Sequence, residues 1–237
     1  MRLSVLETIC FTLLAAFAVG ASLAAEVAER SELAAVNSRD LDEVKLRPGV
    51  DFTAYKSVLI DHPRVEFHPG WTRNMITQRT ATHRLSTQDA RRIAEDFSAS
   101  LERSLAAAFR GRGYSIATSP GPNVLRLSAA VSDLYVNAPE ALVSGGGGGY
   151  LITREAGDAV LRLQVHDAAT AALLATVEHH GYARSVNRLT RTHDVTTRYS
   201  FDTLFDRWAK DCATQLAPPP GQTLSRLELD PTPAPTD

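Results

Sequence analysis

Apolar and polar positions alternate with a period of two in several parts of the chain, and this pattern predicts strands. A first strand is expected from Val58 to Phe67, broken by the turn at His62-Pro63. A short strand is expected from Tyr114 to Ala117 before a Pro-Gly turn. Alternation returns at 124–136, which predicts one half-buried strand, and again at 159–177, which predicts a β-hairpin.

Two other segments repeat apolar residues at every third or fourth position, which indicates amphipathic helices. The first helix is expected to begin after a Ser86 cap, with Asp89 at the capping-box position, and to end near Gly111 and Gly113. Its apolar stripe consists of Ala90, Ile93, Phe97, Leu101, Leu105 and Phe109. The second stripe ends before Pro218, and it consists of Phe201, Leu204, Phe205, Trp208, Cys212 and Leu216.

These elements, each with one apolar face, predict an α+β fold. We expect an antiparallel sheet of about four to five strands with two amphipathic helices packed on one face. The 237 residues are enough for a single domain, expected over 46–217. A charged, Ala-rich segment over 26–45 is interpreted as a flexible tether, and residues 218–237 as a Pro-rich disordered tail.

The first 25 residues predict export. An uncharged apolar run extends from Thr8 to Ala25, and the small residues Ser22 and Ala24 suit a signal-peptidase site, so cleavage is expected near Ala24-Ala25. The alternative is an uncleaved membrane anchor, because about 18 apolar residues reach the lower limit for a spanning helix. Cleavage would remove Cys10 and leave Cys212 as the single cysteine. We expect Cys212 to be a buried and inert thiol.

A resemblance to a known family begins in the stretch from Leu46 to Trp71. The residues that carry it are the turn Arg47-Pro48-Gly49 and the apolar run that leads to Asp61. They resemble the domain-of-unknown-function family 3313, a set of uncharacterised bacterial envelope lipoproteins, and the resemblance covers about 46–216. It implies an envelope protein but no reaction and no partner.

The resemblance continues at the predicted hairpin, with two departures from the family pattern. Asp167, Thr170 and Leu173-Leu174 match, but Ala171 stands where the family usually has Gly, so the type of turn is left open. A lipoprotein also needs its lipidated cysteine at the end of the apolar run, whereas Cys10 lies inside that run.

No motif in the sequence predicts a catalytic residue, a cofactor-binding residue or a metal ligand, and no cofactor is expected. The seven histidines have no recognised ligand spacing, and His179 and His180 are expected on opposite faces of a strand. Five glycines at 145–149 lack the Lys-Ser or Lys-Thr of a phosphate loop, so they predict a flexible hairpin loop. The net charge of −2 and the predicted export disfavour nucleic acid.

The sequence therefore predicts an exported, non-catalytic cell-envelope protein, periplasmic or outer-membrane-associated, that serves as a binding or assembly module. Its partner would be an unknown envelope protein or the membrane surface, to which the Arg-rich segment 184–198 could bind. The sequence leaves the oligomeric state undefined. The alternative is a periplasmic enzyme, which would require His166, His180 or His193 to meet Asp or Glu in a pocket.

Overall fold

The computed structural model describes residues 30, 32–71, 73, 86–137, 155–184 and 194–217. The predicted signal peptide, the five glycines at 145–149 and the Pro-rich tail lie outside these residues. The elements are β1 (Ala34–Val36), β2 (Glu43–Leu46), the 3-10 helix η1 (Phe52–Ala54), β3 (Ser57–Ile60), β4 (Arg64–Phe67), α3 (Thr87–Gly111), β5 (Ser115–Ile116), β6 (Val124–Val136), β7 (Glu155–Asp167), β8 (Leu173–Arg184) and α5 (Asp194–Leu216).

All eight strands belong to one mixed sheet with the order β1-β2-β8-β7-β6-β3-β5, and β4 also pairs with β6. Four neighbouring pairs are antiparallel: β1 with β2, β2 with β8, β8 with β7, and β7 with β6. In contrast, β3 and β4 run parallel to β6, and β3 runs parallel to β5. The predicted fold class, an antiparallel sheet of four to five strands with two helices on one face, is therefore wrong. Alternation shows that a strand has one buried face, but it does not show the direction of its neighbour.

The first two strands correct the interpretation of residues 26–45 as a flexible tether. β1 pairs with β2, and β2 pairs with β8, so the sheet begins at Ala34. Leu41 and Val44 are 5% and 1% exposed. Strands of three and four residues are too short for a period of two to be recognised among charged neighbours.

The prediction of a strand broken by a proline is confirmed. β3 and β4 form successive parts of one strand along β6, with Ile60 opposite Leu127 and Arg64 opposite Ala130. It is called the edge strand here because β5 pairs with only its first two residues and no other described strand pairs with its outer side. The Asp61 amide still donates to the Leu127 carbonyl at 2.9 Å. Pro63 has no amide proton, so the pairing stops there and resumes one residue later.

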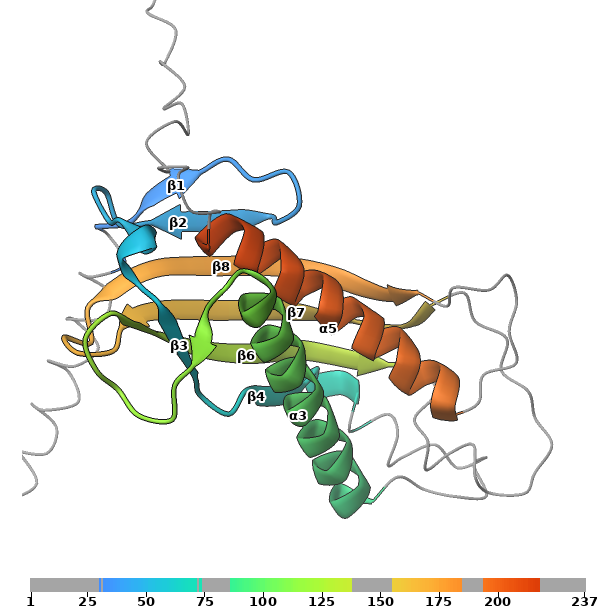
Figure 1. Cartoon of the computed structure of the whole chain (residues 1–237). Coiled ribbons are helices and arrows are strands. Elements are labelled where there is room, and N and C mark those ends of the chain that lie inside the picture. Colours follow the sequence, from blue (N-terminus) through green and yellow to red (C-terminus); the bar gives the residue numbers. More distant parts are fainter. Residues whose placement is uncertain are drawn as a thin grey trace, which may run out of the picture.

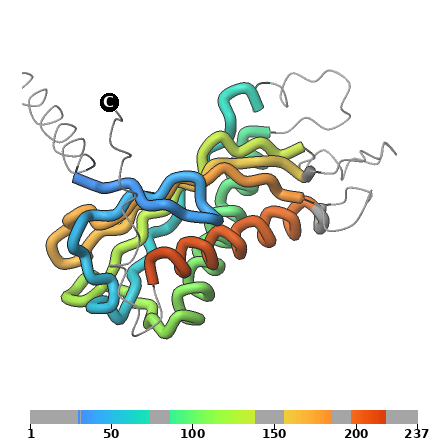
Figure 2. The backbone as a smooth tube through the Cα atoms, turned by 90° about the horizontal axis from the view of Figure 1, so that it is seen from above, coloured from blue at the N-terminus to red at the C-terminus, as the bar shows by residue number. Residues whose placement is uncertain are grey.

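Helices α3 and α5 lie side by side against one face of the sheet (Figure 1), and the view from above shows both on that same side (Figure 2). The predicted capping box is confirmed, since the Ser86 and Asp89 side chains each accept from the other's backbone. The Phe97 and Phe201 rings join the helices, with centroids 4.7 Å apart. α5 begins at Asp194, earlier than its apolar stripe indicates.

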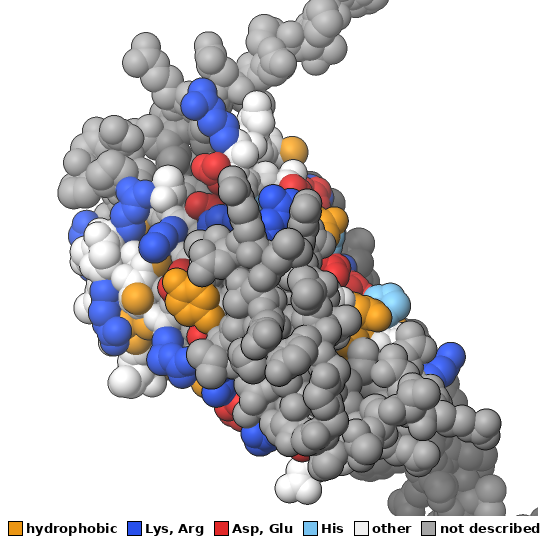
Figure 3. All heavy atoms as spheres, turned by 90° about the vertical axis from the view of Figure 1, so that its right-hand side faces the viewer, with side chains coloured by type: hydrophobic (Ala, Val, Ile, Leu, Met, Phe, Trp, Pro, Cys, Tyr) orange, Lys and Arg blue, Asp and Glu red, His pale blue; other side chains and the backbone are white. Residues whose placement is uncertain are grey.

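The face of the sheet turned away from α3 and α5 is polar. Alternation along β6, β7 and β8 places ion pairs there. Arg126 Nε lies 2.9 Å from Asp61 Oδ2, and Arg162 Nε lies 3.3 Å from Glu178 Oε2. In the end view of Figure 3, basic and acidic side chains are interspersed, with a run of basic side chains along the left flank. Within the described ranges no helix is long and apolar enough to cross a membrane.

Candidate functional site

Of the histidines named in the sequence analysis, His180 is paired with a carboxylate, but not in a pocket. His180 Nε2 lies 3.2 Å from Asp158 Oδ2, but this pair sits on the open face of the sheet with both side chains more than one-third exposed. His166 lies in β7 opposite Arg126 of β6. His193 lies outside the described residues. Among the residues that the structure describes, no three metal-ligating side chains are grouped to hold an ion.

His179 and His180 point to opposite faces of β8, as predicted. His179 faces α5, where its ring meets the Trp208 ring edge-on with centroids 6.3 Å apart. Its Nδ1 lies 3.1 Å from Asp42 Oδ2 but without hydrogen-bond geometry. The β1–β2 connection is instead held on β8 by the His180 amide, which donates to Asp42 Oδ2 at 2.7 Å.

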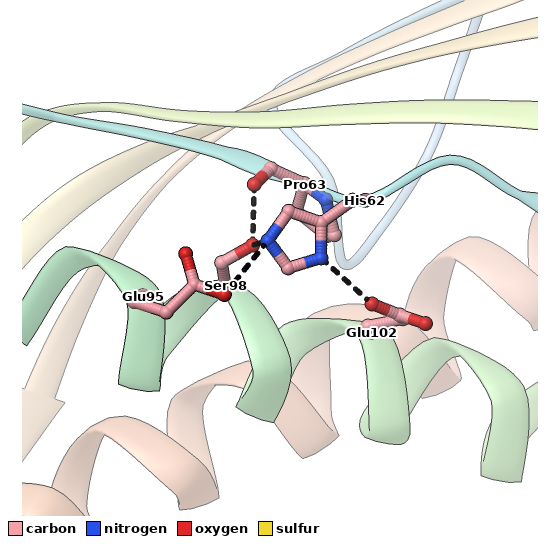
Figure 4. A network of polar contacts seen from close by, with 5 residues as sticks. All are labelled: His62, Pro63, Glu95, Ser98 and Glu102. Carbon is pink, nitrogen blue, oxygen red and sulfur yellow. Dashed lines mark hydrogen bonds and ion pairs between the residues drawn. The ribbon is translucent and has the colours of Figure 1, made fainter. Parts of the chain in front are cut away.

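The densest polar cluster surrounds a different histidine, His62, at the break between β3 and β4 (Figure 4). Helix α3 supplies its partners from one face, because Glu95, Ser98 and Glu102 are spaced by three and four residues. His62 Nδ1 lies 3.0 Å from Glu102 Oε2. His62 Nε2 lies 3.0 Å from Ser98 Oγ and 3.3 Å from Glu95 Oε1.

The connectivity from Ser98 through His62 to Glu102 is that of a serine hydrolase triad. Sequence reasoning missed it, because the three residues lie on two elements and no motif links them. The only signal in the sequence is the polar spacing on α3, which a solvated helix face explains equally well. Whether these residues could act as a triad therefore depends on which group donates and which accepts each hydrogen bond.

The hydrogen bonds at Ser98 favour a structural role for this arrangement over a catalytic one. The Ser98 hydroxyl donates its proton to the Pro63 carbonyl. Its oxygen can then only accept from His62 Nε2–H, so His62 donates to the serine instead of withdrawing a proton from it. Ser98 is also only 3% exposed, which leaves no room for a substrate at its oxygen.

The electrostatics of the cluster favour a positively charged imidazole. The hydrogen bond to Glu102 raises the pKa of His62, burial acts slightly in the opposite direction, and the charge of Glu95 raises the pKa further. An imidazolium can donate from both nitrogens at once, to Glu102 and to Ser98. The cluster is therefore an ionic tie between the edge strand and α3.

A second set of polar contacts, here called the α3–α5 ladder, joins the two helices. It comprises four pairs: Asp96 with Arg198, Ser100 with Asp202, Ser104 with Asp206, and Arg112 with Thr214. Each pair joins residues 102 positions apart, and the pairs are spaced by four or eight residues. Parallel helices in fixed register produce this pattern.

A shallow depression of about 410 Å³ lies on the outer surface of α5. Its walls have mixed charge, and they consist of Tyr199, Asp202, Thr203, Asp206, Arg207, Lys210 and Asp211. Burial and the nearby charge of Asp40 raise the pKa of Asp211. Tyr199 is 59% exposed, so its ring is available for contact. The depression contains no arrangement of nucleophile and base.

Cys212 was predicted to be a buried thiol, and the structure confirms this. Its side chain is 0% exposed in the core below α5. Burial raises its pKa to about 12, so the reactive thiolate is suppressed.

The fold and these contacts define a class of protein: a mixed sheet covered on one face by two parallel helices, whose polar clusters hold elements together. The chain belongs to a specific family within that class. The model of the family described as "Protein of unknown function (DUF3313)" matches residues 25–212, most of the chain. The resemblance seen in the sequence is thereby confirmed. No curated protein matches the chain.

Solved structures show only distant similarity. A dodecamer of a PelC variant from Paraburkholderia phytofirmans is 10% identical, with a TM-score of 0.38 over 73% of this chain and 98% of that chain. A putative neuraminyllactose-binding hemagglutinin homolog from Helicobacter pylori is 13% identical, with a TM-score of 0.36 over 71% and 86%. A DUF4136 family protein from Bacteroides thetaiotaomicron is 7% identical, with a TM-score of 0.33 over 78% and 97%. Similarity at this level carries no argument about activity or partners.

Proposed function

We propose that the protein is an exported, non-catalytic module of the cell envelope that acts by binding or assembly. The observation that carries this proposal is the direction of the hydrogen bonds at Ser98. The triad-like arrangement around His62 brings a serine, a histidine and a carboxylate together in a catalytic order. Its protons run the wrong way for a nucleophile.

The apolar run from Thr8 to Ala25 supports the location. Its length and its small terminal residues fit a signal sequence cleaved near Ala24-Ala25. The partner would be an envelope protein or the membrane surface. Proteins of this kind need an ordered scaffold and exposed polar surface, and the sheet offers both on the face that α3 and α5 leave open.

The absence of serine catalysis can be tested with a fluorophosphonate probe, which labels activated serines. The purified protein should remain unlabelled at Ser98. Labelling that disappears in Ser98→Ala, while Ser132→Ala still reacts, would overturn the non-catalytic part of the proposal. Ser132 is a suitable control because it lies on β6 and its hydroxyl has no hydrogen-bond partner among the described residues.

The location can be tested by the intact mass of the protein from soluble and membrane fractions of cells. A soluble species that begins at Ala25 or Glu26 is expected. A membrane-bound species that retains Met1 would make the first segment an anchor. A mass with acyl chains on Cys10 would instead establish a lipoprotein.

A further inference from the structure

The break between β3 and β4 is held to helix α3 by two consecutive residues. Ser98 Oγ donates to the Pro63 carbonyl, while His62 contacts Ser98, Glu95 and Glu102. Beyond this break, β4 pairs with β6 only, and no other described strand pairs with its outer edge. The cluster is therefore well placed to control how firmly this part of the edge strand is held.

With the Ser98 proton donated to the Pro63 carbonyl, the charged form of His62 satisfies this environment best. A neutral imidazole has one N–H and one lone pair. If Nε2 carries the proton, the lone pair of Nδ1 faces the Glu102 carboxylate 3.0 Å away. If Nδ1 carries it, the lone pair of Nε2 faces Ser98, whose proton is already donated to Pro63, and the Glu95 carboxylate 3.3 Å away. Either neutral form thus has one repulsive contact.

The charged groups around His62 all act in the same direction. Helix α3 presents Glu95 and Glu102 to the ring, and both are acidic. On the side of β6, the basic group of Arg126 is held by Asp61 at 2.9 Å on the opposite face of the strand. Arg126 is thus neutralised by its own partner and does not offset the two glutamates.

We propose that His62 is a proton-operated latch that fastens the β3–β4 edge strand to helix α3. With the proton bound, the imidazolium bridges the strand to Glu102 and Glu95. When the proton leaves, one contact becomes repulsive and the strand opens locally around Pro63. The latch stands independently of the proposed function, since it would operate in an enzyme or a binding module alike.

The direction of the pH dependence follows from the raised pKa of His62. A histidine with a higher pKa in the folded state stabilises that state below its unfolded pKa of about 6.5. This contribution is lost as the pH rises through the raised folded pKa. The latch is therefore closed at mildly acidic pH and opens at alkaline pH.

The latch can be tested by amide hydrogen exchange, corrected for the intrinsic effect of pH. The reporters are the amides of Asp61 and His68, which donate to the Leu127 and Leu134 carbonyls of β6 on either side of the break. Between pH 6 and pH 8.5 their opening should rise about two- to fivefold relative to amides inside β6, because an exposed ionic contact is modest. Added salt should reduce the change.

Two variants separate the latch from a general effect of pH. His62→Gln should raise the exchange at pH 6 and remove the pH dependence, because its amide stays neutral. His180→Gln is the matched control, since it removes a histidine–aspartate pair on the open face and should exchange like the wild type. If His62→Gln proves too unstable to study, Glu102→Gln keeps the side chain and should weaken the pH response.

The proposal would be overturned by either of two results. One is an unchanged exchange at Asp61 and His68 in the wild type while ring ¹⁵N shifts show that His62 titrates. The other is a pH dependence that persists at full size in His62→Gln or Glu102→Gln. Either result would mean that the cluster is a static contact and that the proton has no mechanical effect.

Discussion

Ala171 is the residue at which the sequence departs most visibly from its family, and the structure shows what the departure costs. The turn between β7 and β8 is held by Asp167 Oδ1, which accepts from the Ala169 and Thr170 amides at 2.9 and 2.8 Å. Tyr55 donates its hydroxyl to Asp167 Oδ2 at 2.8 Å. Ala171 then has a φ of 60°, in the left-handed region that favours glycine. Backbone geometry therefore explains why glycine would suit this position, as the resemblance implies.

We expect Ala171→Gly to stabilise the protein by roughly 0.5–1 kcal/mol. Relief of the left-handed alanine is worth about 1–2 kcal/mol, and the greater freedom of glycine in the unfolded chain offsets part of it. Chemical denaturation would measure the change. Ala169→Gly is the control, because Ala169 has no left-handed backbone and should lose stability. Destabilisation of similar size by both variants would refute the explanation.

Gly181 permits the close approach of α5 to β8. A Cβ atom at this position would lie 2.7 Å from Leu204 Cδ1 and 2.8 Å from Trp208 Nε1. Gly181→Ala should therefore force the helix away from the sheet and lower the free energy of unfolding by about 1–3 kcal/mol. Gly121→Ala is the matched control, because its nearest neighbour is a methyl group 4.0 Å away. Equal thermal midpoints for these two variants would argue against tight packing at Gly181.

At the scale of elements, the α3–α5 ladder has one empty position. Ala108 and Lys210 are also 102 residues apart and fall between the pairs at 104 and 112. Neither belongs to a pair of the ladder. The register of the helices therefore places an unused amino group opposite a short side chain.

A glutamate at position 108 should complete the ladder. We expect Ala108→Glu to stabilise the protein by about 0.2–1 kcal/mol, the range of an exposed ion pair. A double-mutant cycle with Lys210→Ala would isolate the coupling between the two side chains. Coupling energy near zero at low salt would show that the register is looser than the four existing pairs indicate.

Sequence patterns predicted the elements better than their arrangement. The capping box at Ser86 and the strand over 124–136 follow from local chemistry, so they could be predicted. The first two strands could not, because they are short and surrounded by charge. The parallel pairing of β3 with β6 depends on the crossover through α3, which no local pattern encodes. This pairing is what makes the sheet mixed.

The candidate site could not be predicted from the sequence, because it too depends on how the elements are arranged. His62 was recognised as a turn residue beside Pro63, and its partners on α3 were interpreted as a solvated face. Their meeting depends on where the helix crosses the edge strand. The buried thiol of Cys212, in contrast, followed from its place in an apolar stripe and could be predicted.

For the whole molecule, the two N-terminal strands should be necessary for a stable domain. A chain that begins at Leu46 lacks the buried Leu41 and Val44 and leaves β8 without its neighbour. Since each buried apolar side chain contributes about 1.5–3 kcal/mol, the loss should exceed roughly 3 kcal/mol and promote aggregation through the exposed strand edge. Thermal melting and light scattering would measure both effects. A chain that begins at Arg30 is the control. Equal melting temperatures and equal light scattering of the two chains would support the interpretation of residues 26–45 as a flexible tether.

The spacing of 102 residues in the ladder also determines when α3 and α5 can meet during folding. Every pair of the ladder closes a loop that contains β5, β6, β7 and β8. The turn between β7 and β8 closes a loop of only a few residues, so the antiparallel strands can assemble early. Contacts across such long sequence distances slow folding. The two helices should therefore come together after the β7–β8 hairpin has formed.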